Sequence, residues 1–176
     1  DMGNVMHMAL EKFAAEVRKE GLDWAELTEE ERNRIIDSCL DQVSADYGNT
    51  ILKSSARNEY MIERTRRILR RTVWALQEQL KHGAFRPEGF EVRFQGGRID
   101  RVDIMEEPEN NRVYVKVIDY KTGNTSFDLL ALYHGLQLQL MVYLDGALQV
   151  EKRKYPDREI VPAGVFYYNV KDPMIQ

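Results

Sequence analysis

Residues 97–103 read GRIDRVD, and residues 117–123 read VIDYKTG. Each segment sets aspartates among branched apolar residues, a pattern typical of β-strands with a buried face. In an extended chain, residues two apart face the same side, so Asp119 and Lys121 point together in any fold. If the two strands pair across the polar turn at residues 106–111, Asp100 or Asp103 meets Asp119 on one face of the sheet.

Two carboxylates held close together indicate a cation site. They repel each other unless a cation lies between them, and oxygen ligands favour magnesium, manganese or calcium over zinc. A lysine beside such a cation can hold an attacking water or steady the charge on a phosphate, while the metal polarises the phosphoryl oxygen. The pattern predicts metal-assisted phosphodiester hydrolysis, although an isolated Asp-x-Lys is more often a solvated strand face or an ion pair.

The surrounding periodicity predicts a mixed α/β arrangement. Helical spacing covers residues 4–20, and Thr28 with Glu31 forms a capping-box pattern that opens a second helix. A long helix is expected at 52–80, closed by His82-Gly83, and a Leu-rich one at 129–150. Strands are expected at 90–94, 98–104, 112–120 and 160–170, the last of them buried. The first three read as an antiparallel set, and the last helix as a crossover to a parallel strand.

Composition narrows the class of protein further. The 176 residues are 43% apolar and 31% charged, with a net charge of −4, as in ordinary globular proteins. No apolar run approaches the roughly 18–20 residues that span a bilayer, and no secretory signal opens the chain. The single cysteine, Cys39, cannot form an internal disulfide, and it is expected to be a buried small residue. A cytoplasmic location is therefore expected. The abrupt ends suggest a segment of a longer protein.

Four motifs occur in a specific order along the chain. These are Gly3 with His7 in the first helix, GRIDRVD, IDYKTG and then QLMVY at residues 139–143. In this order they resemble the RecB-like branch of the PD-(D/E)XK nuclease superfamily, and most closely its AddB-type domains. The resemblance implies a restriction-endonuclease-like core, a mixed sheet flanked by helices with a helical insertion after the first helix. In a single domain over 1–176, the first core helix is 1–20, the insertion 22–83, and the catalytic sheet and helix 88–176.

The resemblance also implies roles for individual residues. Asp100 and Asp119 are expected to bind a catalytic Mg²⁺, for which Mn²⁺ could substitute. His7 and the Ile118 carbonyl are expected as further ligands, and Lys121 as the group that positions or activates water. Gln139 and Tyr143, four apart on one helix face, are expected to contact DNA or support the lysine.

Alternatives accompany several of these residues. Asp103 lies three positions from Asp100 and so faces the other side of the strand, where an ion pair with Arg101 or Arg98 is expected. Gln137 is a second candidate for the role of Gln139, but it lacks a tyrosine four residues on. His7 sits on a mostly apolar helix, and without the resemblance it reads as an ordinary surface or core histidine.

The resemblance also implies partners and a cofactor. DNA and an AddA-like helicase–nuclease subunit are the expected partners, in an exonuclease that processes unwound DNA during double-strand-break repair. AddB-type domains commonly carry a [4Fe-4S] cluster on four cysteines. With Cys39 alone, either those cysteines lie outside this chain or this branch has lost them. A non-catalytic DNA-binding or scaffolding module and a Cas4-like or phage-type exonuclease are the alternatives.

Basic residues gather between positions 57 and 86. Eight Lys or Arg residues face three glutamates there, a local balance of +5 in a chain of net −4. One reading is a solvated helix face with Glu–Arg pairs. The other is a surface that follows the DNA backbone, with binding that falls as salt rises, for which Arg64, Arg67 and Arg71 are the candidates.

Overall fold

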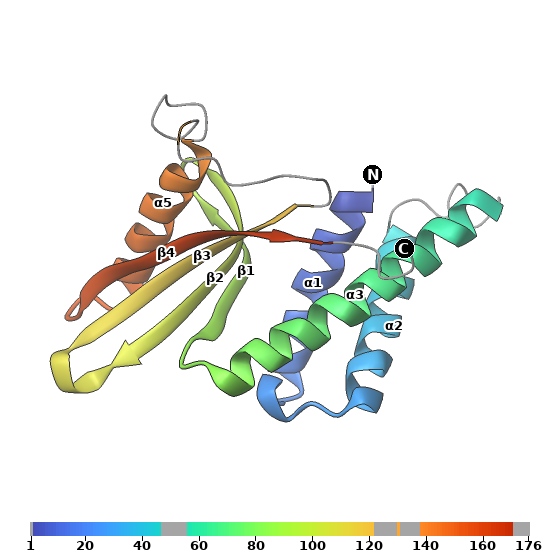
Figure 1. The fold of residues 1–176 in the computed structure, drawn as a ribbon, viewed down its shortest axis with the longest axis horizontal. Helices are drawn as coiled ribbons and strands as arrows, with labels where there is room; N and C mark the ends of the chain where they lie inside the picture. The colour runs from blue at the N-terminus through green and yellow to red at the C-terminus, as the bar shows by residue number, and fades with distance from the viewer. Residues whose placement is uncertain (1, 47–55, 122–129, 131–137, 171–176) are drawn as a thin grey trace. The chain divides into compact units, whose positions relative to one another are not determined.

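The computed structural model describes residues 2–46, 56–121, 130 and 138–170. The chain divides into two compact units, one of Asp1–Gly83 with Val170–Gln176 and the other of Ala84–Asn169. Figure 1 gives the path of the chain through both. None of the described helices is long and apolar enough to cross a bilayer.

The first unit is helical. It contains α1 (Met2–Lys19), the short 3₁₀ helix η1 (Trp24–Glu26), α2 (Glu29–Asp46) and α3 (Ala56–His82), and all three α-helices pack on one another. The predicted capping box at the start of α2 is confirmed. The Thr28 backbone N–H donates to Glu31 Oε2 at 2.9 Å, and the Glu31 N–H donates to Thr28 Oγ1 at 3.2 Å. Both bonds satisfy amide groups that a helix start leaves without partners.

Apolar stripes hold these helices together. The buried positions recur three or four residues apart, as one face of a helix requires, and they include Phe13 and Val17 on α1, Ile36 and Leu40 on α2, and Val73 and Leu76 on α3. Gln77 of α3 is also buried. Its Nε2 donates to the carbonyls of Ala25 at 3.1 Å and Leu27 at 2.6 Å, so it ties the turn before α2 to α3.

The second unit is a four-stranded sheet with one helix against it. The strands β1 (Arg86–Phe94), β2 (Gly97–Glu107), β3 (Arg112–Lys121) and β4 (Glu159–Asn169) lie in that order, and α5 (Gln139–Lys154) packs against the sheet (Figure 1). The first two pairs are antiparallel and β3 pairs parallel with β4, as the sequence predicted. The mixed sheet flanked by helices is the expected fold class.

Three details differ from the expectation. The β2–β3 turn is shorter than 106–111, because β2 continues to Glu107 and only Pro108–Asn110 (η2) and the left-handed Asn111, with φ 55°, turn the chain. β4 is an edge strand, so its side chains are half-buried or exposed rather than buried, and Phe166 is 50% exposed. α5 runs beyond residue 150 to Lys154, and the expected helical residues 129 and 131–137 lie outside the described residues, as do 47–55.

The core of the second unit lies between the sheet and α5. Ile104 and Val102 on β2 are less than 2% exposed, as are Val113, Val115 and Val117 on β3, and they pack with Ala147 of α5. Asp100 and Asp119 continue these two alternating rows by one more step. The apolar rows therefore place both aspartates on the side of the sheet that α5 covers.

Candidate active site

Strand register brings Asp100 and Asp119 together. Arg101 on β2 is the partner of Ile118 on β3, so Asp100 and Asp119 are the next residues on each strand. The backbone N–H of Tyr120 donates to Asp100 Oδ2 at 2.8 Å, which fixes the Asp100 carboxylate against β3. Because neighbouring residues across paired strands face the same side, the two carboxylates share one face, as expected for Asp100 in preference to Asp103.

Asp119 is a buried carboxylate. It is 4% exposed, and Lys121 Nζ lies 2.6 Å from its Oδ2. Burial raises the pKa of Asp119, and the nearby charge of Asp100 raises it further, while Lys121 opposes both effects. Despite this short ion pair, Asp119 Oδ2 is a buried oxygen without a hydrogen bond among the described residues.

This carboxylate pair fits a divalent cation. Two acidic groups share one face, and a buried oxygen lacks a hydrogen bond among the described residues, which is costly unless another positive group approaches it. All the donors in the pair are carboxylate oxygens, the ligands that Mg²⁺ and Mn²⁺ prefer. The residues present are therefore suited to a hard divalent metal.

Lys121 lies two residues after Asp119 on the same side of β3, so Asp100, Asp119 and Lys121 form a row of charged residues on one face, here called the carboxylate row. Burial alone would lower its pKa, but the attraction of the Asp119 carboxylate outweighs this, so its pKa is raised. Its ammonium group also lies 5.4 Å from the centre of the Tyr167 ring. Tyr167 on β4 is the register partner of Asp119. At neutral pH, Lys121 in this state is a cation and a hydrogen-bond donor, not a base.

The two predicted residues of α5 are hydrogen-bonded to each other. Gln139 Nε2 donates to Tyr143 Oη at 2.8 Å, four residues along the helix. Burial raises the pKa of the Tyr143 hydroxyl, and the charges of Asp119 and Asp100 add to the effect. The charges of both carboxylates therefore act on the Tyr143 hydroxyl. Gln137, the alternative to Gln139, lies outside the described residues.

The roles of the remaining predicted residues stay predictions, and the structure places each residue on an element of its own unit. His7 is half-buried on α1 in the helical unit, and its role as a ligand stays a prediction, as does that of the Ile118 carbonyl on β3. Arg64, Arg67 and Arg71 lie on α3, also in the helical unit. Cys39 is buried as predicted, and burial raises the pKa of its thiol to about 11, so it is a thiol at neutral pH.

Glu91 on β1 is a further acidic residue next to Asp100, and the sequence patterns did not predict it. The pairs Phe90–Arg101 and Val92–Ile99 place it opposite Asp100, and carboxylate oxygens of Glu91 and Asp100 lie within 4.8 Å of each other. Glu91 is 8% exposed and has a φ of 51°, which is rare for a residue with a side chain. Its Oε2 is 2.5 Å from Arg98 Nε. If the turn at Gly96-Gly97 is assumed to pair Phe94 with Gly97, counting three residues outward along each strand sets Glu91 opposite Asp100, so the sequence could have predicted this neighbour.

The opposite face of the same strands carries a buried ion pair. Arg101 is 1% exposed, and it donates to both oxygens of Asp103, from Nε at 2.6 Å and from Nη2 at 2.5 Å. Its Nη1 donates to Tyr120 Oη at 3.1 Å. The predicted ion pair of Asp103 is thus confirmed, with Arg101 as the partner. It supports the backbone on which Asp119 and Lys121 lie.

Sequence comparisons identify the family. All of residues 1–176 match the pattern of the PD-(D/E)XK nuclease superfamily. The chain belongs to this superfamily. It is also 46% identical, over 99% of its length, to a subunit of the ATP-dependent helicase/deoxyribonuclease of Lachnoclostridium phytofermentans, and 37% identical, over its whole length, to the corresponding protein of Alkaliphilus metalliredigens. The chain spans 16% and 17% of these relatives, so it corresponds to about one sixth of each.

Membership in a nuclease superfamily agrees with the geometry of the site. The residues that the sequence singled out, Asp100, Asp119 and Lys121, lie on one side of two paired strands. Their individual roles stay predictions, because a fold and a family do not by themselves establish which side chain does the chemistry.

Proposed function

We propose that this chain is the metal-dependent nuclease domain of a helicase–nuclease, and that it hydrolyses phosphodiester bonds of unwound DNA. The row formed by Asp100, Asp119 and Lys121 carries the proposal, because it combines an acidic pair suited to a cation with a fixed ammonium group. The relatives' name, a helicase/deoxyribonuclease, supports DNA as the substrate.

Each residue of the row has a defined task in this proposal. Asp100 and Asp119 would hold Mg²⁺ or Mn²⁺, with His7 and the Ile118 carbonyl as further ligands. When bound, the metal would polarise the phosphoryl oxygen and lower the pKa of an attacking water. Lys121, charged at neutral pH, holds that water or steadies the negative charge that grows on the phosphate. Gln139 fixes the Tyr143 hydroxyl, which can donate to a DNA phosphate.

The reaction is a direct displacement at phosphorus. The oxygen of water forms the new P–O bond, and the bond to the leaving sugar oxygen breaks. The proton of the water passes to solvent, and the leaving oxygen takes up a proton in turn. No residue of the row need form a covalent intermediate.

The cellular setting is part of the proposal. A domain of this kind would act as an exonuclease in double-strand-break repair and recombination, in the cytoplasm, with an AddA-like protein as its partner. The relatives are named as one subunit of their enzyme, which supports a second, partner chain. A [4Fe-4S] cluster would need cysteines other than Cys39.

Cleavage of single-stranded DNA with Mg²⁺ or Mn²⁺ tests the proposal. Lys121→Met is expected to abolish metal-dependent cleavage, and EDTA is expected to abolish it in the parent chain. Lys116→Met is the matched control, because Lys116 lies on the same strand but faces Asp103 on the other side of the sheet, 3.3 Å away. It should retain cleavage.

Two outcomes would contradict the site assignment. Cleavage that persists in Lys121→Met, or that is lost equally in Lys116→Met, would mean that the row is not the reacting centre. If the parent chain itself does not cut DNA, Mn²⁺ is titrated calorimetrically into the parent and into Asp119→Asn. This measurement separates a metal site that binds but does not cleave from a non-catalytic scaffold. A scaffold would show no difference in metal binding between them.

A further inference from the structure

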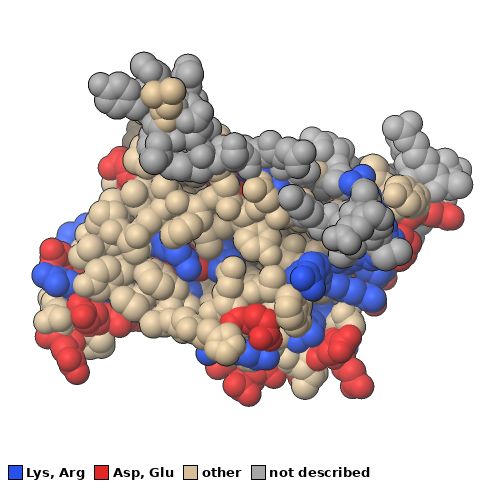
Figure 2. All heavy atoms as spheres, in the orientation of Figure 1, with Lys and Arg blue, Asp and Glu red and all other residues tan. Residues whose placement is uncertain are grey.

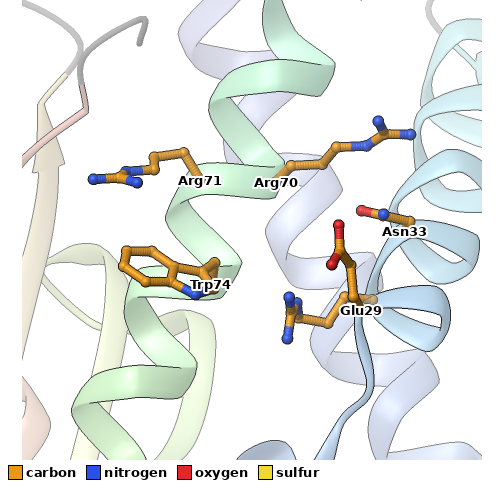
Figure 3. Close-up of a pocket in the computed structure, with 6 residues that line it drawn as sticks. Glu29, Asn33, Arg70, Arg71 and Trp74 are labelled. Atoms are coloured by element: carbon orange, nitrogen blue, oxygen red, sulfur yellow. The ribbon is translucent and has the colours of Figure 1, made fainter.

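A basic cavity lies between α2 and α3 in the helical unit, separate from the carboxylate row in sequence and in composition. Its volume is about 480 Å³. Figure 3 shows its lining residues, with Arg71 and Trp74 on one side of α3 and Arg70 pointing toward Asn33 on α2. The lining consists of Glu29, Arg32 and Asn33 from α2, and Arg70, Arg71 and Trp74 from α3.

Trp74 is an exposed aromatic platform on this wall. The residue is 40% exposed, although its neighbours Val73 and Leu76 are fully buried in the helical core. The guanidinium carbon of Arg71 lies 4.6 Å from the centre of the Trp74 ring. The other tryptophan, Trp24, packs on Phe13 instead, with ring centres 5.2 Å apart. A ring that is left partly exposed beside a stacked guanidinium offers a flat surface to a planar ligand.

The charge of the cavity favours an anionic ligand. Three arginines and one glutamate line it, and Figure 2 shows Lys and Arg side chains gathered over the part of the surface that α3 forms. Arg70 is held by Asp37, with Nη2 3.2 and 3.3 Å from its two oxygens. Arg32 donates to Gln77 and, at 3.4 Å, to the Leu27 carbonyl. Because these arginines are anchored, a ligand need not immobilise them on binding.

A nucleotide combines both features, a negative charge and a flat ring. Proteins that bind single strands combine a basic groove for the phosphates with aromatic side chains on which bases stack, and the stacking tolerates any base. We propose that this cavity binds one nucleotide of a single DNA strand, with its base on the Arg71–Trp74 platform and its phosphate facing Arg32 and Arg70. Asn33 lies within reach of the same nucleotide as a polar partner. The proposal rests on the proposed function in that unwound DNA is the substrate.

Tryptophan fluorescence tests the stacking directly. The sequence has two tryptophans, so Trp24→Phe, which keeps an aromatic ring against Phe13, leaves Trp74 as the only tryptophan emitter. Thymidine oligonucleotides are titrated into this variant in EDTA, so that binding is read without cleavage. Emission from Trp74 is expected to be quenched, and the midpoint is expected to move to higher DNA concentration as salt rises. An unchanged emission at saturating DNA would overturn the proposal.

Variants then measure the contribution of the platform. With a labelled oligonucleotide, Trp74→Ala is expected to weaken binding roughly five- to a hundredfold, the range of base–aromatic stacking. Arg71→Ala is expected to weaken it more than Lys81→Ala, which removes one positive charge from α3 outside the cavity. Equal losses in the two would indicate general charge attraction and would refute a nucleotide site. If Trp74→Ala does not fold, the quenching of Trp74 in the Trp24→Phe chain decides the matter.

Two further ligands separate a nucleotide from other anions. An abasic strand of the same length keeps the phosphates but has no bases, so it should quench Trp74 little and should bind equally well to the parent and Trp74→Ala. A poly-glutamate peptide should compete weakly. If either quenches Trp74 as strongly as thymidine DNA does, the cavity recognises charge or an acidic protein and not a base.

This test is independent of the carboxylate row. Binding in EDTA does not require the metal, and the same titration can be run on Lys121→Met. A chain that shows the quenching but never cuts DNA supports the cavity and counts against the proposed function. A chain that cuts DNA but shows no quenching of Trp74 refutes the nucleotide site in the cavity and leaves the proposed function standing.

Discussion

Removal of the Asp103 carboxylate should destabilise the second unit strongly. Asp103 is fully buried, and Arg101, which is 1% exposed, donates to both of its oxygens. Asp103→Ala would leave the guanidinium buried with the Tyr120 hydroxyl as its remaining side-chain partner among the described residues. Burial by itself disfavours the charged form of Arg101, and Tyr120 and Asp103 raise its pKa instead. The cost therefore comes from an arginine that can neither lose its proton nor reach water.

The expected loss is about 3–5 kcal/mol, the range for removing one partner of a buried ion pair. Lys116, 3.3 Å from Asp103 and partly exposed, adds at most about 1 kcal/mol, because its ammonium group can turn to solvent. In a chain of this size, each kcal/mol lowers the melting temperature by roughly 2–4 °C. A loss of about 3–5 kcal/mol should therefore lower the melting temperature by roughly 6–20 °C. That loss is a large part of the about 5–15 kcal/mol by which a domain is usually stable.

Urea unfolding followed by far-ultraviolet circular dichroism measures this loss. Tryptophan emission is less suitable, because Trp24 and Trp74 both belong to the helical unit. Asp145→Ala is the matched control. Asp145 is an aspartate on α5 that accepts a hydrogen bond from Gln149 at 2.7 Å, and its removal should cost no more than about 0.5 kcal/mol.

A double variant separates the ion pair from the space it fills. Arg101→Met with Asp103→Leu replaces the two charges by apolar side chains, and it should recover most of the stability that Asp103→Ala loses. A loss below about 1 kcal/mol in Asp103→Ala would show that water reaches the pair. A double variant no more stable than Asp103→Ala would show that the geometry of the pair, rather than its uncompensated charge, dominates. Either result would refute the reasoning.

Three other substitutions test separate features by thermal or urea unfolding. A Cβ on Gly146 would lie 2.3 Å from the Phe94 ring, so Gly146→Ala should cost about 1–3 kcal/mol through overpacking, and an unchanged midpoint would contradict that contact. Thr28→Ala removes the capping hydroxyl of α2 and should cost about 1 kcal/mol, whereas Thr28→Ser should restore it. Burial raises the pKa of Glu151 despite its ion pair with Lys154, so its ionised form destabilises the fold. Stability from this group is present below the unfolded pKa and is lost as pH rises through the folded one. Glu151→Gln should therefore melt higher than the parent at pH 7 and no higher at pH 4. A parent that melts higher than Glu151→Gln at pH 7 would contradict the sign.

Local patterns were sufficient to predict most of the architecture. The alternation of Val113, Val115 and Val117 marks a strand with one buried face, and Thr28 with Glu31 marks a helix start. Both are properties of neighbouring residues, so they can be read from the sequence without knowledge of the fold. The shared face of Asp100 and Asp119 required one more step, the assumption that β2 and β3 pair across the turn between them.

Features that depend on packing were not predictable in this way. The exposure of β4 follows from its place at the sheet edge, which a run such as Val165-Phe166-Tyr167-Tyr168 does not reveal. The backbone of Glu91 has a positive φ that its residue type does not favour. The Trp74 cavity exists only because α2 and α3 pack with six particular side chains between them. The helical spacing of Trp74 on α3 gives no sign that its ring remains exposed.

The two faces of β2 and β3 explain how a cluster of like charges can be held in place. On the side that α5 covers, the apolar rows end at Asp100 and Asp119. Burial first and the charge of Asp100 second raise the pKa of Asp119, so holding its ionised carboxylate there costs free energy. On the other side, Arg101, Asp103 and Tyr120 form a satisfied polar network. Tyr120 belongs to both faces, since its hydroxyl accepts from Arg101 while its backbone N–H donates to Asp100. The buried network therefore stabilises the strand segment that holds the carboxylates together, so the carboxylate pair and the stability of the sheet depend on the same few residues.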